Sequence, residues 1–387
     1  MSHVALVIPG LDRIGGAERQ VMLLAKGLRG RGWRVSVVAL TGAGGQTVHE
    51  LASAEIAFLS LEMRKGWADP RGWIRFHGWL RRERPDVVHA HLPHAAWLAR
   101  WSRLAAPAPV VIDTLHSSWT GPLGRRLGYR LSGWLPDRVT AVSQAVADAH
   151  LAAGLVNRRT LSVLPNGVDM EVWRPDASLR VAVRHELGSA DEFWWLAAGR
   201  LDPVKDYPTL LRAMVATPES ARLLIAGDGP LRSELVGLSA RLGLERRVRF
   251  LGFVPDLTRW LQAADAFVLS SQWEGLPMGL IEAAASGLPA VATDVPGSRE
   301  VIAQGQTGWL TAPGDADALA EAMATLMETP PDQRRAMGER ARRQAIERFS
   351  LETVLDHWER LYVDLLREKS QRITSDRIGT LNGSSSS

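Results

Sequence analysis

Short apolar runs alternate with longer segments of helical hydrophobic spacing along most of the chain. Runs rich in valine, leucine, isoleucine and alanine predict strands at 3–9, 34–40, 86–92, 110–116 and 138–143. Runs of the same kind predict a second set at 193–199, 222–228, 247–252, 266–271 and 289–294. This alternation is typical of parallel sheets that helices cover on both faces, so the pattern predicts an α/β protein.

The predicted strands form two groups, and a turn-rich segment at 165–179 lies between them. We therefore predict two Rossmann-like, doubly wound parallel-sheet domains, at 1–170 and 171–350, that face a central cleft. We expect the helical pattern at 351–369 to pack back on the first domain. Residues 371–387 lack periodicity, which predicts a disordered tail.

The segment 273–294, WEGLPMGLIEAAASGLPAVATD, carries two glutamates. Pro277 suits the first turn of a helix and Gly287 suits its end, so Glu274 would precede the helix and Glu282 would lie on its second turn. The helix N-terminus between them would offer N–H groups to a phosphate. This arrangement favours a nucleotide-sugar, with its ribose at Glu282 and its sugar near Glu274. The alternative is that Glu274 caps the helix and Glu282 faces solvent.

Two other loops carry groups suited to a phosphate. Arg200 and Lys205, in GRLDPVKD, follow a predicted strand, and their charges suit a diphosphate, although a solvated surface pair is the alternative. Gly15 and Gly16 follow the first predicted strand, where backbone N–H groups can approach a phosphate or a sugar. The G-x-G-x-x-G spacing of a dinucleotide site is absent from this loop, which disfavours a Rossmann oxidoreductase.

Taken together, these motifs resemble those of the retaining nucleotide-sugar glycosyltransferases of family 4, which have the GT-B fold. Six motifs occur in the family's order, and they span nearly the whole chain before the predicted tail. They are IGGAER (14–19), TLH (114–116), PNGVD (165–169), GRLDPVKD (199–206), AGDGPL (226–231) and the stretch at 273–294.

The resemblance implies which residues form the site. The implied donor-binding residues are Gly15, Gly16, Arg200, Lys205, Glu274, Gly275, Leu276, Pro277, Met278, Gly279 and Glu282. Glu274 would contact the transferred sugar and Glu282 the ribose hydroxyls. Arg200, Lys205 and Glu274 would also act in catalysis, together with His116, which would orient the donor sugar. Family members often have a larger apolar residue in place of Gly279, so we expect extra room beside the sugar here.

Histidines gather in the first predicted domain. His89, His91 and His94 have no carboxylate at helical spacing to complete a zinc site. We therefore expect His91 to lie on the acceptor side of the cleft, and Glu18, one turn into its helix, is a second acceptor-side candidate.

The sequence favours transfer without a metal or a cofactor. Asp315 and Asp317 form its one Asp-x-Asp pair, and their context predicts a helix N-cap with an acidic first turn. Cysteine is absent, which excludes disulfides and thiolate metal sites. The N-terminus has no signal-peptide pattern and no apolar run reaches the ~18 residues of a membrane span, so we expect a cytoplasmic protein.

The charge is uneven along the chain. Residues 1–175 hold 22 Lys and Arg against 13 Asp and Glu, a net charge of +9, whereas residues 176–387 carry −5. Arginines alternate with aromatic residues at helical spacing in 71–85, 95–106 and 121–136. This pattern favours helices on the anionic inner face of the membrane, and ordinary amphipathic helices are the alternative. No motif supports nucleic-acid binding.

We therefore expect a retaining glycosyltransferase that moves a sugar from a nucleotide-sugar to a hydroxyl. The family favours a UDP-sugar donor and a lipid-linked or saccharide acceptor, in cell-surface polysaccharide or glycolipid biosynthesis. Two other functions stay open. One is a GT-B sugar-nucleotide epimerase or hydrolase, and the other is a non-catalytic nucleotide-sugar-binding scaffold at the membrane.

Overall fold

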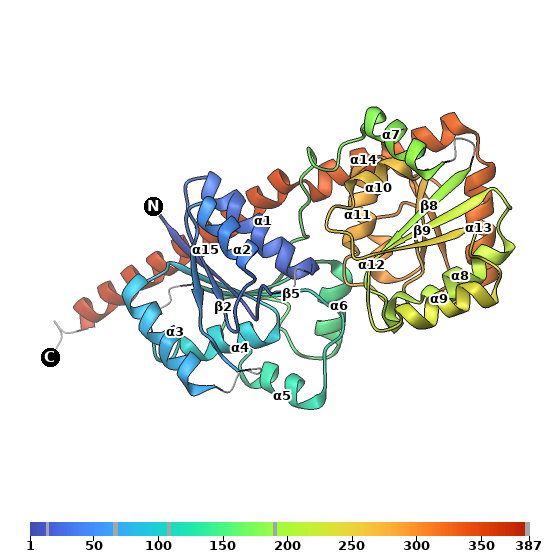
Figure 1. Cartoon of the computed structure of the whole chain (residues 1–387). Coiled ribbons are helices and arrows are strands. Elements are labelled where there is room, and N and C mark those ends of the chain that lie inside the picture. The colour runs from blue at the N-terminus through green and yellow to red at the C-terminus, as the bar shows by residue number, and fades with distance from the viewer. Residues whose placement is uncertain (13–14, 65–68, 107–109, 189–191, 384–387) are drawn as a thin grey trace. The chain divides into compact units, whose positions relative to one another are not determined.

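The computed structural model describes residues 1–12, 15–64, 69–106, 110–188 and 192–383 (Figure 1). The chain divides into two compact units. The first unit comprises Met1–Gly167 and Leu351–Ser387, and the second comprises Val168–Ser350. The division at Gly167 lies close to the predicted boundary at residue 170.

The first unit contains a parallel sheet in the order β3-β2-β1-β4-β5-β6-β7. Its strands are β1 (His3–Ile8), β2 (Arg34–Ala39), β3 (Ala57–Ser60), β4 (Val87–His91), β5 (Val110–Leu115), β6 (Arg138–Ala141) and β7 (Leu161–Val163). Every residue of β1, β4 and β5 is buried, as expected where helices cover both faces. The sequence missed β3 and β7, because these edge strands are short and half-buried and show no continuous apolar run.

Helices cover both faces of this sheet. They are α1 (Gly16–Gly30), α2 (Gly45–Ser53), α3 (Pro70–Glu83), α4 (Pro93–Ser102), α5 (Leu123–Leu131), α6 (Gln144–Ala152) and α15 (Leu351–Gly383). Residues of α1, α2 and α15 share one core with the sheet, and α3 and α4 lie on its other side (Figure 1).

Helix α15 packs on the first unit, as its apolar spacing requires. Leu355, Trp358 and Tyr362 are at most 5% exposed and join the core beneath α1. A Cβ at Gly27 would lie 2.4 Å from Leu355 Cδ1, so only glycine allows α1 and α15 to come this close. The helix continues to Gly383, so the structure has helix over most of the segment for which the sequence predicts disorder; residues 384–387 lie outside the described ranges. Propagation adds one backbone hydrogen bond per residue to a helix that has already started, so α15 can extend beyond its packed part.

The second unit contains a parallel sheet in the order β10-β9-β8-β11-β12-β13. Its strands are β8 (Phe193–Ala198), β9 (Ala221–Ala226), β10 (Val248–Gly252), β11 (Ala266–Leu269), β12 (Ala290–Thr293) and β13 (Gly308–Thr311). The sequence predicted all of them except the edge strand β13, which is again half-buried.

Two layers of helices cover the second sheet (Figure 1). They are α7 (Ala177–Leu187), η1 (a 3₁₀ turn, Pro203–Lys205), α8 (Tyr207–Ala216), α9 (Arg232–Arg241), α10 (Thr258–Ala263), α11 (Met278–Ala285), α12 (Pro296–Arg299), α13 (Ala316–Glu328) and α14 (Pro331–Phe349). Helices α8, α9 and α13 share the core of one face, and α7, α10, α11 and α14 pack with one another on the other side. In the described ranges, no helix is both long and apolar enough to cross a membrane.

Candidate active site

Both sheets reverse their strand order once, and ligands of open α/β sheets bind beyond the carboxyl ends of the strands at this point. In the second unit the reversal lies between β8 and β11. The loop after β8 carries Lys205 and the loop after β11 carries Glu274. The sheet topology alone therefore brings two predicted site residues to one edge.

The side chains of Lys205 and Glu274 form an ion pair at this edge. Lys205 Nζ lies 2.5 Å from Glu274 Oε1, and the two side chains are 22% and 11% exposed. Ser271 Oγ donates a second hydrogen bond to the same oxygen, at 2.6 Å. Both contacts use Oε1, and among the described residues none forms a hydrogen bond with Oε2. The sequence did not single out Ser271.

Two hydrogen bonds, one from a side chain and one from the backbone, join the two loops. Ser270 Oγ donates to the carbonyl of Lys205 at 2.8 Å, and the Gln272 N–H donates to the carbonyl of Val204 at the same distance. The turn η1, which ends at Lys205, is therefore fastened along the start of the loop that leads to Glu274.

Helix α12 supports the Glu274 loop from another side. A Cβ at Gly297 would lie 2.8 Å from the carbonyl oxygen of Glu274 and 2.9 Å from that of Gly275. Only glycine permits this approach, so Gly297 is a positioning residue that the sequence reasoning missed. The Pro-Gly pair that follows β12 was its one signal in the sequence.

Arg200 behaves differently from Lys205. Its side chain is 70% exposed, and its ion pair with Asp202 is long, at 4.0 Å. In the described part of the chain, no contact joins it to the Lys205–Glu274 pair. Its role at a diphosphate stays a prediction.

Helix α11 starts at Met278 with Pro277 at the N-cap, close to the predicted start. The N–H groups of Leu280 and Ile281 both donate to the Pro277 carbonyl. Gly287, in the left-handed region at φ +76°, follows the helix end. Glu282 is 5% exposed, so the alternative of a solvent-facing Glu282 is wrong.

The expectation of extra room at Gly279 is also wrong. A Cβ there would lie 3.2 Å from Phe267 Cζ on β11 and 3.6 Å from the carbonyl of Ala198 on β8. The missing side chain therefore faces the sheet, where the Phe267 ring already fills the space.

The AGDGPL motif brings the loops after β8 and β9 together. A Cβ at Gly227 would lie 1.9 Å from the Gly199 carbonyl oxygen, and one at Gly229 would lie 2.4 Å from that of Leu201. Gly227 also has φ +151°, which side-chain-bearing residues rarely adopt. This motif therefore shapes the loop that holds Arg200 and Lys205.

In the first unit the strand order reverses between β1 and β4. Gly15 is the N-cap of α1, after β1, and its N–H donates to Glu18 Oε2 at 3.1 Å. Glu18 thus caps its own helix, and its acceptor-side role stays a prediction. Ile14 of the IGGAER motif lies outside the described residues.

His91, at the end of β4, contacts His116, which directly follows β5. His91 Nδ1 lies 3.1 Å from His116 Nε2. Burial lowers the pKa of His116 to about 4 and the pKa of His91 well below its usual value, so both rings are neutral near pH 7. The two predicted histidines therefore form one neutral, hydrogen-bonded pair.

A small cavity lies beside this pair. Its volume of about 20 Å³ suits roughly one water molecule. It is lined by Gln20, Leu24, His91, Thr114, His116, Pro165, Asn166, Leu351, Val354 and Trp358. His91 Nε2 is buried, and none of the described residues forms a hydrogen bond with it. The Gln20 side chain also holds the PNGVD segment in place. Its amide N–H donates to the Gly167 carbonyl, and its amide oxygen accepts from the Gly167 N–H.

His89 is a structural residue. Its Nδ1 lies 2.7 Å from the Tyr362 hydroxyl and its Nε2 lies 2.6 Å from Thr114 Oγ1. Both ring nitrogens are thus engaged, so metal binding through either nitrogen of His89 would break a buried hydrogen bond. The N-cap prediction for Asp315 is confirmed, since its carboxylate accepts from the Ala318 N–H at 2.9 Å.

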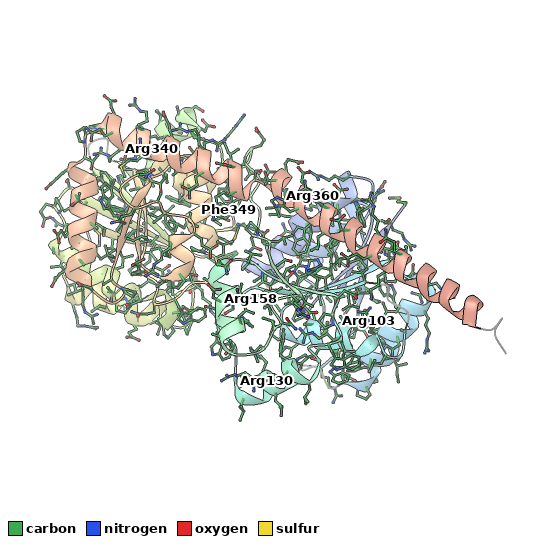
Figure 2. The ribbon with its side chains drawn as sticks, turned by 180° about the vertical axis from the view of Figure 1, so that it is seen from behind. Arg103, Arg130, Arg158, Arg340, Phe349 and Arg360 are labelled. Carbon is green, nitrogen blue, oxygen red and sulfur yellow. The ribbon has the colours of Figure 1, made fainter. Side chains whose placement is uncertain are left out.

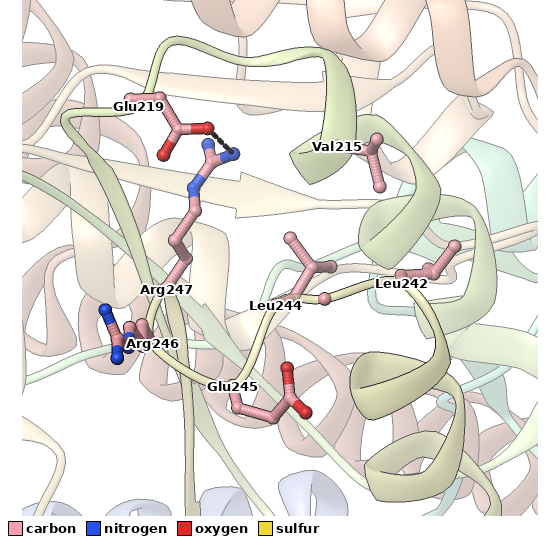
Figure 3. Close-up of a pocket in the computed structure, with 8 residues that line it drawn as sticks. Val215, Glu219, Leu242, Leu244, Glu245, Arg246 and Arg247 are labelled. Atoms are coloured by element: carbon pink, nitrogen blue, oxygen red, sulfur yellow. Dashed lines mark ion pairs between the residues drawn. The ribbon is translucent and has the colours of Figure 1, made fainter.

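A larger cavity, of about 470 Å³, lies elsewhere in the second unit (Figure 3). Its lining loops precede β9 and β10, so it lies at the opposite ends of the strands from Lys205 and Glu274. Arg247, at its wall, donates to the carbonyls of Thr217, Pro218 and Ala221. Arg247 therefore stabilises the turn at 217–221. None of the predicted site residues lines this cavity.

The comparisons with known proteins agree with this geometry. Residues 14–172 match the model of Glycosyltransferase Family 4, and residues 183–344 match that of Glycosyl transferases group 1. N-acetyl-alpha-D-glucosaminyl L-malate synthase of Bacillus anthracis is 30% identical over 302 residues, which are 74% of this chain and 77% of that enzyme. The chain belongs to the family 4 glycosyltransferases. The predicted family is thereby confirmed.

Two further likenesses concern the fold and the kind of substrate. A family 4 relative from Escherichia coli, UDP-Gal:alpha-D-GlcNAc-diphosphoundecaprenol alpha-1,3-galactosyltransferase, is 26% identical over 316 residues, 78% of this chain and 81% of that enzyme. The solved structure of Anabaena HepE in complex with UDP-glucose superposes with a TM-score of 0.78 at 25% identity, and covers 96% of this chain and 99% of that one. The predicted GT-B fold, two Rossmann-like units, is thus confirmed as well.

Proposed function

We propose that this glycosyltransferase moves a sugar from a UDP-sugar to a hydroxyl of a lipid-linked or saccharide acceptor, with retention at the anomeric carbon. The observation that carries this proposal is the Lys205–Glu274 pair at the reversal of the second sheet, one loop before α11 and the buried Glu282. A cation, a helix N-terminus and a carboxylate at one sheet edge suit a diphosphate flanked by two sugars.

Each residue has a distinct task in this proposal. Lys205 Nζ, fixed by Glu274, neutralises charge on the leaving diphosphate, and the N-terminus of α11 contributes the positive end of its dipole. The carboxylate of Glu274 contacts the transferred sugar through Oε2, and Glu282 accepts from the ribose hydroxyls. His116 and His91, both neutral, supply hydrogen bonds to the sugar and to the acceptor side.

Retention is assigned to attack on the face that the leaving group occupies. The bond from the anomeric carbon to the diphosphate breaks as the bond to the acceptor oxygen forms on the same face. A diphosphate oxygen takes the proton of the acceptor hydroxyl. This route needs no covalent intermediate and no metal, and it uses the cations described above.

Relatives support the substrate classes. The Anabaena HepE structure holds UDP-glucose, and the name of the Escherichia coli enzyme gives a UDP-sugar donor and a diphosphoundecaprenol-linked acceptor. We extend these classes to this chain: a UDP-sugar, and an acceptor of cell-surface polysaccharide or glycolipid biosynthesis. We also propose that the enzyme works in the cytoplasm, peripherally on an anionic membrane.

A thermal-shift panel of UDP-, GDP- and ADP-sugars with the free nucleotides tests the donor. One ligand at 100 times its Kd stabilises a protein by about 2.7 kcal/mol, which is readily measured. We expect a shift with a UDP-sugar, and transfer that persists in a chelator. The absence of any shift would overturn the donor proposal, and loss of activity that Mn²⁺ restores would overturn metal-free transfer. Donor hydrolysis unaffected by acceptors would instead favour a hydrolase.

A further inference from the structure

Three segments, 71–85, 95–106 and 121–136, combine arginines with aromatic residues in the sequence. The structure shows that they differ in the burial and the ion pairing of these side chains. In α3, Phe76 and Trp79 are buried in the core. Three arginines at this helix are ion-paired, as Arg71–Asp69, Arg75–Glu62 and Arg82–Glu83. Helix α3 is therefore an ordinary amphipathic helix whose positive charge is largely compensated.

Helix α4 also turns its charge inward. Arg100 is fully buried, is ion-paired with Asp113 and stacks on the Tyr129 ring at 4.5 Å. Arg103, one residue after the helix, is ion-paired with Asp137 at 2.7 Å. The arginines of this segment form internal ion pairs, so they do not support a membrane-facing helix at α4.

Helix α5 has the opposite character. Leu123, Leu127 and Leu131 repeat every fourth residue, and they are 78%, 55% and 60% exposed. Such spacing places them on one face of the helix. The flanking Trp119 and Trp134 are 57% and 70% exposed. A continuous apolar stripe thus faces outward from the first unit.

The other face of α5 is firmly attached to the unit. Tyr129 is 3% exposed and Ser132, just after the helix, is fully buried, and both contact Arg100 of α4. A Cβ at Gly128 would lie 2.7 Å from the Trp97 ring, which shows how closely the helices pack. The exposed leucines therefore lie on a helix that is already fixed, and no rearrangement is needed to present them.

The charge of the segment that carries the stripe is purely positive. Residues 114–136 contain no Asp or Glu. In the described part of the chain, Arg125, Arg126 and Arg130 form no ion pair with a carboxylate. Arg125 lies over the Trp119 ring at 4.9 Å, and Arg130, labelled in Figure 2, donates to the carbonyls of Ala153 and Gly154.

We propose that α5, with Trp119 and Trp134, is a docking surface for an anionic lipid bilayer. An interfacial helix needs three features, and α5 has them: leucines on one face, tryptophans at its two ends, and arginines without acidic neighbours in the sequence. The leucines would enter the acyl-chain region, the tryptophans would lie at the headgroup level, and the arginines would meet the lipid phosphates. A protein partner would require acidic groups placed against each arginine, whereas a lipid surface supplies mobile phosphates.

The docking surface adds a membrane site to the proposed function. It depends on that function in one respect only, the identity of the acceptor as a lipid-linked molecule. Leu123 follows His116 by seven residues, which span at most about 25 Å. A bilayer at α5 would therefore lie within about 25 Å of His116, on the unit that holds the predicted acceptor side. The proposal assigns the acceptor to the membrane side of the first unit.

Sedimentation of the full chain with vesicles tests the surface. The vesicles contain phosphatidylcholine alone or an equal mixture with phosphatidylglycerol, at 50 and 500 mM salt. We expect binding to the mixed vesicles that weakens about 10-fold at high salt, since the attraction is screened. The double variant Leu123→Ser/Leu127→Ser should weaken it about 10-fold further. Two controls, Val181→Ser on α7 and Ile74→Ser on α3, change similarly exposed residues and should bind as the wild type does.

Three results would overturn the proposal: no binding at low salt, equal binding to both vesicles, or equal binding by the leucine variant. UDP-sugar binding, measured by calorimetry on the same proteins, separates this proposal from the proposed function. Lost vesicle binding with intact donor binding in the leucine variant supports the surface. Intact vesicle binding without donor binding in the wild type would overturn the donor and leave the surface standing.

Discussion

Lys205 Nζ and Glu274 Oε1 lie 2.5 Å apart, although the residues are 69 positions apart in the chain. Lys205 lies in the loop after β8 and Glu274 in the loop after β11. The reversed strand order makes these two strands neighbours, so their carboxyl ends lie side by side. A flexible lysine held by a carboxylate loses its freedom before a substrate arrives. The pair therefore holds the Lys205 ammonium group in a fixed position, where the proposed function places the diphosphate.

Replacing Lys205 should impair transfer more than binding. We expect Lys205→Met to lower kcat by about 100-fold, because charge on the leaving group is no longer compensated as it develops. Arg212→Met, which removes an exposed cation of α8, is the matched control and should leave kcat unchanged. In a double-mutant cycle with Glu274→Gln, the two effects should not add, since one group orients the other. Additive effects would contradict the coupling.

Replacing Glu282 should weaken the binding of free UDP and of the UDP-sugar by the same factor. Both ligands carry the ribose, and its hydroxyls lose a charged acceptor in Glu282→Gln, which corresponds to about 10-fold in Kd. Calorimetry with both ligands measures this, and Glu321→Gln on the exposed face of α13 is the control. A loss confined to the UDP-sugar would place Glu282 at the sugar and not at the ribose.

Gly227 should tolerate no side chain. A Cβ there would lie 1.9 Å from the Gly199 carbonyl oxygen, at φ +151°, so we expect Gly227→Ala to destabilise the second unit by about 3 kcal/mol. Gly237→Ala, within α9, meets only Arg241 Nη1 at 3.4 Å and should stabilise by up to about 1 kcal/mol. Denaturant unfolding measures both, and equal stability of the two variants would refute the packing argument.

The buried histidines should make the first unit sensitive to acid. Burial lowers the pKa of His89 and His91 well below 6.5, and that of His116 to about 4. Between pH 6.5 and 4 the unfolded chain therefore binds more protons than the folded one, and stability falls as the pH falls.

The variant His91→Gln removes one of these three titrating side chains. The glutamine cannot titrate, so the slope of unfolding free energy against pH should decrease by about 1.4 kcal/mol per pH unit below pH 6.5. Urea unfolding between pH 7.5 and 5 measures the slope. His357→Gln, at an exposed position of α15, should not change it. An unchanged slope in His91→Gln would mean that the ring is protonated in the folded state.

The sequence by itself determined the architecture and the family. Buried parallel strands leave continuous apolar runs, and Pro277 and Gly287 mark the ends of α11, because these signals act within a few residues. Local patterns also placed the second glutamate among apolar neighbours, where the structure buries it. The edge strands β3, β7 and β13 were invisible, since their half-exposed residues carry no such signal.

Only the tertiary structure decided which residues meet. It brought Lys205 and Ser271 to the same oxygen of Glu274, paired His91 with His116, and filled the space at Gly279 with Phe267. It also showed that Arg71, Arg75 and Arg82 at α3 and Arg100 of α4 are paired with carboxylates, whereas the arginines of α5 have no such partner among the described residues. The reason is physical: charge and composition are properties of a segment, but burial and pairing depend on the groups that the fold brings from distant segments to the same place.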